Sequence, residues 1–125
     1  MTIAETAINV DRLRAELQFL TANPALFDPT IWAARTECGT VGCLAGWTVI
    51  HEGIPLDFLS SGGDTGATKN LGSIAEVAAD ILGLEDDVAD WLFAGCNSLH
   101  RLWRLASELT NGAIQVPADL PVGAA

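Results

Sequence analysis

Apolar residues recur at helical spacing along most of this chain, in short stretches that are each bounded by a capping residue and by glycine or proline. The clearest stretch covers residues 9–22, where Asn9 suits the N-cap and Pro24 follows the end. No stretch alternates apolar and polar residues for long enough to indicate a β-strand. The sequence therefore predicts an all-α fold, with a single compact domain of about five short helices packed orthogonally.

A second helix signal lies near the middle of the chain and is rich in small residues. Thr40 suits its N-cap, and Gly53 suits the position just beyond its end. Gly42 and Gly46 are four residues apart and leave one face almost without side chains. We expect another helix to pack closely against that bare face, and we expect Trp32, a little upstream, to anchor the core.

Clear helix boundaries also mark the second half of the chain. Ser73 and Glu76 have the spacing of a capping box, three acids open a helix over residues 85–95, and Asn97 suits the cap of a last helix. Residues 54–70 lack apolar spacing. The predicted organisation is a flexible loop near residues 54–70, one helical domain over residues 1–112, and an extended, proline-containing tail over residues 113–125.

The charge of the chain limits its partners. It carries 16 acidic and 6 basic residues, a formal net charge of −10 over 125 residues. Direct nucleic-acid binding needs clustered Lys and Arg, so it is not expected.

The longest apolar run, residues 41–50, is too short for membrane insertion. Residues 1–9 lack the basic and apolar regions of a secretory signal, which predicts a cytoplasmic protein with reduced thiols.

The segment 38–47, Cys-Gly-Thr-Val-Gly-Cys-Leu-Ala-Gly-Trp, carries a family resemblance. It is similar to the Cys-Gly-Thr-x-x-Cys-x-Ala-Gly-Trp signature of small actinobacteriophage and actinobacterial proteins of unknown function. Phe27-Asp28, Trp32 and the segment 78–84 also agree, and the likeness covers roughly residues 10–110. Many relatives have Thr where this chain has Glu85. The resemblance implies an origin and a fold, and it implies no activity for particular residues.

The cysteine and histidine residues are candidates for a metal site or for a reactive thiol. Cys38 and Cys43 are separated by four residues, and Cys96 and His100 by three. These are ligand types of structural zinc sites, and they would converge only if two helix N-termini met. The other expectation is no cofactor and buried thiols. A Cys38–Cys43 disulfide and a thiol made reactive by a helix N-terminus are further alternatives. Cys–His catalysis is not expected, because His51 is predicted to lie two helical turns from Cys43.

Acidic residues are concentrated in the second half. Six of the 16 lie between Glu76 and Asp90, where no basic residue occurs. Such a surface can steer docking to a basic partner, and it also serves solubility. The last helix has a basic outer edge, with Trp103 between two arginines, and both residue types are frequent in binding hot spots. The candidate protein-binding residues are Glu85, Asp86, Asp87, Asp90, Trp103 and Arg104.

Three functional hypotheses follow from these patterns. The leading one is a small, non-enzymatic protein of phage or actinobacterial type that binds another protein, for example a host protein. The second is an acidic DNA mimic that inhibits a nucleic-acid-binding protein. The third is a zinc- or thiol-dependent protein built on Cys38, Cys43, Cys96 and His100. The oligomeric state stays open.

Overall fold

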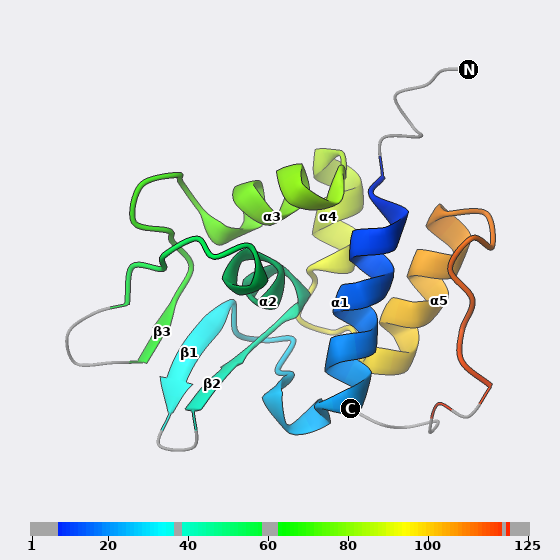
Figure 1. Cartoon of the computed structure of the whole chain (residues 1–125), viewed down its shortest axis with the longest axis horizontal. Helices are drawn as coiled ribbons and strands as arrows, with labels where there is room; N and C mark the ends of the chain where they lie inside the picture. Colours follow the sequence, from blue (N-terminus) through cyan, green and yellow to red (C-terminus); the bar gives the residue numbers. More distant parts are fainter. Residues whose placement is uncertain (1–7, 37–38, 59–62, 119, 121–125) are drawn as a thin grey trace.

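The computed structural model describes residues 8–36, 39–58, 63–118 and 120 (Figure 1). None of the helices in these ranges is long and apolar enough to cross a membrane. In chain order the elements of the described part are α1 (Val10–Ala22), the 3-10 turn η2 (Pro24–Leu26), β1 (Ala33–Thr36), β2 (Gly39–Gly42), α2 (Leu44–His51), β3 (Gly63–Thr65), α3 (Ile74–Leu82), α4 (Asp86–Leu92) and α5 (Leu99–Leu109).

The predicted all-α fold is wrong, because the described chain also contains an antiparallel sheet with strand order β2-β1-β3. In this mixed α/β fold, Ala33 of the central strand pairs with Gly42 of β2 and with Thr65 of β3. The sheet lies beside α2, to one side of the helical body (Figure 1). Each strand has only three or four residues, which is too short to show the period-two pattern that indicates strands.

Two other expectations fail where these strands form. Thr40 belongs to β2 and caps no helix, and α2 begins after Cys43. Its predicted end near Gly53 is confirmed, and Gly53 has a φ of +82°. The region predicted as a flexible loop, 54–70, contains β3 and a bridge between Leu56 and Thr68, so that prediction is wrong for the part described; residues 59–62 lie outside it.

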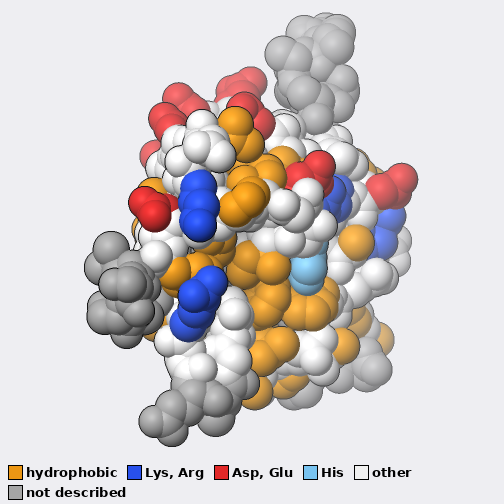
Figure 2. Space-filling model, turned by 60° about the vertical axis from the view of Figure 1, so that its left-hand side comes forward, with side chains coloured by type: hydrophobic (Ala, Val, Ile, Leu, Met, Phe, Trp, Pro, Cys, Tyr) orange, Lys and Arg blue, Asp and Glu red, His pale blue; other side chains and the backbone are white. Residues whose placement is uncertain are grey.

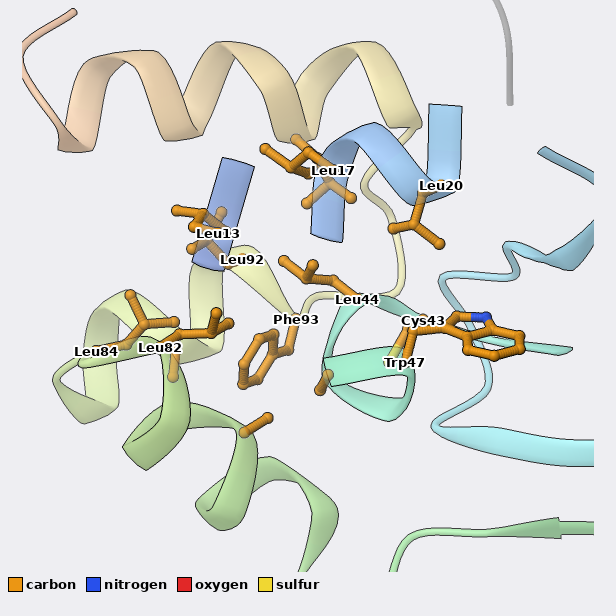
Figure 3. Packing of buried hydrophobic residues seen from close by; sticks show 14 of the residues in the cluster. Leu13, Leu17, Leu20, Cys43, Leu44, Trp47, Leu82, Leu84, Leu92 and Phe93 are labelled. Atoms are coloured by element: carbon orange, nitrogen blue, oxygen red, sulfur yellow. The ribbon is translucent and has the colours of Figure 1, made fainter. Parts of the chain in front are cut away.

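Helix α2 is the centre of the core, and all its residues from Leu44 to Val49 are buried. Leucines on one face of α1 contact it from one side, and α3 packs against it from another. Figure 3 shows Leu44 between Leu17 of α1 and Phe93 at the end of α4. Figure 1 shows α2 end-on, with α1 and α5 side by side next to it.

Most of the predicted helix boundaries are confirmed. Asn9 accepts a hydrogen bond from the backbone of Arg12, and Ser73 and Glu76 form the reciprocal capping box. The expected cap of the last helix is wrong by one residue, because Ser98 is the N-cap of α5. The Asn97 side chain instead donates to the carbonyls of Trp91 and Leu92, which satisfies the end of α4.

The segment after α5 runs back along the helical body (Figure 1). Arg14 of α1 donates to the carbonyl oxygen of Ala113 at 2.8 Å, and Ile114 is completely buried. Leu120 is also buried. The described part of the segment predicted as a tail therefore contributes to the core.

Candidate functional site

Helices α3 and α4, with the turn between them, carry a dense set of carboxylates, which we call the acidic face. All of its members are exposed, and no Lys, Arg or His of the described chain lies within ion-pair distance of any of them. Figure 2 shows acidic side chains gathered at the top of the molecule, where α3 lies in Figure 1. The acidic face consists of Glu76, Asp80, Glu85, Asp86, Asp87 and Asp90.

A cavity of about 330 Å³ lies between α3 and α4, and we call it the Trp32 groove. Three residues of the acidic face line it, and five apolar residues form the rest of its wall. Its lining combines a large aromatic ring with carboxylates that form no ion pair within the described chain. The lining residues are Trp32, Ala75, Glu76, Ala79, Asp86, Ala89, Asp90 and Phe93.

Trp32 is not the core anchor that the sequence predicted, because 37% of the residue is exposed. Its ring meets the Phe93 ring edge to face, with centroids 6.2 Å apart and an interplanar angle of 83°. Its indole N–H makes no hydrogen bond within the described chain, whereas the indoles of Trp47 and Trp103 each donate one. Trp32 therefore lines the groove with an aromatic ring, and its indole N–H has no hydrogen-bond partner within the described chain.

Gly42 at the end of β2 and Gly46 in the first turn of α2 explain how Trp32 reaches this position. A Cβ atom on Gly46 would overlap the Trp32 carbonyl oxygen, and one on Gly42 would lie 2.6 Å from it. The backbone at Trp32, just before β1, therefore packs against the bare face of Gly42 and Gly46. The expectation that another helix packs against this face is wrong. A Cβ on Gly66 would come within 3.1 Å of the Trp32 ring. Three glycines make room for this one tryptophan.

The other residues predicted to bind a protein do not lie together, and one of them, Trp103, is buried. Glu85 and Asp87 belong to the acidic face but do not line the groove. Trp103 is only 3% exposed, and its indole donates to the Thr21 hydroxyl at 2.8 Å, so it belongs to the α1–α5 packing. Arg104 is exposed on α5, away from the groove lining.

Sequence reasoning did not single out Trp91 as a surface residue, although it is 62% exposed. It lines a second hollow of about 290 Å³ between α4 and α5, together with Asp90 and Arg101. The Trp32 groove and this hollow therefore share Asp90 and lie along the same short helix. The helical period of α4 could have indicated this exposure. Ala89 and Leu92 form its buried face, which leaves Trp91 on the outer side.

The candidate zinc ligands are not seen together. Cys38 lies outside the described residues, and within the described part no group of three or more His, Cys, Asp or Glu could hold a metal ion. Cys43 is buried, while Cys96 is exposed at the second hollow and His100 lies on α5. Burial raises the pKa of the Cys43 thiol despite nearby backbone N–H groups, so the expectation of a thiol activated by its helix N-terminus is wrong here.

A charged cluster between α1 and α2 was also not anticipated. Glu16 has only 3% of its side chain exposed, and its carboxylate contacts Arg12 Nε at 3.1 Å and His51 Nδ1 at 2.7 Å. Arg12 also pairs with Glu52 at 2.6 Å. Burial of the guanidinium lowers the pKa of Arg12, but its hydrogen bonds to Glu52 and Glu16 outweigh burial and raise it overall. This charged cluster links α1 to α2, and the contact between His51 and Glu16 is part of that link.

The chain was compared with known protein families, curated proteins and solved structures, and none of them matches it. The candidate site therefore rests on its own geometry and charge.

Proposed function

We propose that the protein acts by binding a basic partner protein through its acidic face, without catalysing a reaction. The observation that supports this proposal is the absence of any cationic partner for six neighbouring carboxylates within the described chain. Complementary charge on a partner would speed association and select against acidic competitors.

The positions of the carboxylates strengthen this interpretation. Glu76 and Asp80 are four residues apart on α3, and Asp86 and Asp90 are four residues apart on α4. Like charges at this spacing destabilise a helix by about 0.2–0.5 kcal/mol per pair. A bound cation would remove that repulsion, so these acids favour the complex over the free protein.

The surroundings of the acidic face also suit a protein interface. Trp32 lines the groove on one side of α4, and Trp91 of α4 itself lines the hollow toward α5. Tryptophan is among the residues most enriched in binding hot spots. Both are accessible beside charged residues, as expected where aromatic anchors are surrounded by a polar rim.

A capture experiment with matched variants tests this proposal. Immobilised wild-type protein is compared with Asp86→Asn/Asp90→Asn and with the control Asp57→Asn/Glu108→Gln, whose two acids are exposed elsewhere. Both variants lose the same formal charge. From an actinobacterial lysate, we expect a saturable basic protein on the wild type and the control, and much less on the groove variant. Equal retention by all three proteins would contradict the proposal.

A further inference from the structure

We propose that the Trp32 groove receives an arginine side chain of the basic partner, an inference that rests on the proposed function. The groove has about 330 Å³ of space, near the lower end of the usual range for ligand pockets. That space suits one long side chain rather than a helix, which is about 10 Å across with its side chains. The partner would therefore bind over the acidic face and insert a single anchor.

Charge and shape together favour arginine in this groove. A guanidinium stacks on an aromatic face and donates up to five hydrogen bonds in one plane, often two of them to a single carboxylate. Trp32 supplies the aromatic face, and Asp86 and Asp90 supply unpaired carboxylates on the same wall. The stem of the arginine side chain would lie against Ala79 and Ala89.

The other possible occupants fit these observations less well. Lysine carries the same charge, but its ammonium is strongly hydrated and cannot stack or pair in a plane. An apolar side chain would remove water from the carboxylates without pairing them, which costs free energy. A second copy of this chain would bring another formal charge of −10 toward the acidic face.

The support behind Trp32 makes the groove a preformed site. Because Gly42 and Gly46 have no side chains, the backbone of Trp32 can lie directly against them. A hydrogen bond from Cys43 N–H to the Ile31 carbonyl, at 2.9 Å, fixes the chain in this position. Phe93 contacts the ring from the side of α4. An aromatic wall held in place loses little conformational entropy when a ligand stacks on it.

Calorimetric titration with two peptides tests the inference. One peptide alternates glycine with arginine, and the other has lysine at the same positions, so length and charge are equal. We expect the wild type to bind the arginine peptide about tenfold more tightly than the lysine peptide. Trp32→Leu should remove the part of this difference that comes from stacking, and Trp32→Phe should keep more of it, with folding of both variants checked by circular dichroism. Asp57→Asn/Glu108→Gln should behave as the wild type.

The possible results separate this inference from the proposed function. If both peptides bind equally, and both lose affinity in Asp86→Asn/Asp90→Asn, the arginine site is wrong and binding by the acidic face stands. If neither peptide binds the wild type, both proposals fail. If Trp32→Leu does not fold, the wild-type preference and its partial retention in Trp32→Phe decide. An arginine preference that Trp32→Phe leaves at full strength would also contradict a role for the indole.

Discussion

Gly42 and Gly46, in the segment 38–47, leave room for the backbone of Trp32 to approach β2 and α2 closely. Sequence reasoning correctly identified Gly42 and Gly46 as a site of close packing. It assigned the wrong neighbour, because the partner is the backbone carbonyl of Trp32. A pair of glycines indicates that something approaches closely, but the approaching group is set by tertiary structure. The placement of Trp32 at the groove therefore had no direct signal in the sequence.

Replacing Gly46 by alanine tests this close approach. In an exposed helix interior the change would stabilise the protein by roughly 1 kcal/mol. Here we expect a loss of about 3 kcal/mol, because the new methyl group overlaps the Trp32 carbonyl. Urea unfolding measures the difference. Gly95→Ala is the control, since a Cβ there meets nothing closer than 3.5 Å. A stabilised Gly46→Ala protein would show that the contact is absent.

Cys43 predicts how stability changes at alkaline pH. Its pKa is raised by burial in the folded state, so its thiol keeps its proton at pH values where the unfolded chain begins to lose it. The stability from this group is therefore complete below the unfolded pKa and falls as the pH rises above about 8.5. Urea unfolding of wild type and Cys43→Ala across that range should show a steeper loss for the wild type. Parallel pH profiles would contradict the assignment.

At the scale of secondary structure, helices were predictable because their ends carry local signals. Asn9, Ser73 and Glu76 act within four residues of their own positions, so a sequence pattern is enough to find them. The strands were missed because Ala33–Thr36 is held by pairing with β2 and β3, and its composition does not favour a strand. Pairing with β3, at Gly63–Thr65, joins segments about 30 residues apart, which no local pattern shows.

The junction of α1 and α2 gives a prediction at this scale. Glu16→Gln removes the buried charge that accepts hydrogen bonds from Arg12 and faces His51. Hydrogen bonds to charged groups contribute about 1.5–3 kcal/mol, so we expect the free energy of unfolding to fall by about 2 kcal/mol. Glu108→Gln, on the exposed face of α5, should change it very little. The two variants are compared by urea unfolding, and equal stabilities would argue against the cluster as the link between these helices.

At the scale of the whole molecule, the net charge is unevenly distributed. The acidic face occupies one end, while Figure 2 shows basic side chains lower on the same view, beside an apolar area. Arg35 of β1 has its guanidinium 4.2 Å from the centre of the Phe58 ring. The sequence predicted the acidic segment, since six acids without a basic residue stand close together in it. It could not show the groove, which forms only when α3, α4 and Trp32 meet.

Salt should weaken binding at the acidic face. The screening length falls from about 10 Å at 0.1 M salt to about 3 Å at 1 M, so attraction between exposed charges is lost over that range. We expect the affinity for the arginine peptide to fall at least tenfold. The fall should be smaller in Asp86→Asn/Asp90→Asn, because fewer charges contribute. Calorimetry at a series of salt concentrations measures both slopes, and an affinity independent of salt would contradict an electrostatic interface.

Mapping of amide and indole NMR signals shows whether a basic partner binds at the Trp32 groove. With the arginine peptide, we predict the largest shifts in residues 74–93 and in the indole N–H of Trp32. The indole N–H of Trp103, which is bonded to Thr21 between α1 and α5, should stay unchanged. Shifts concentrated on α1 and α5, with the Trp32 signal unmoved, would contradict binding at the Trp32 groove.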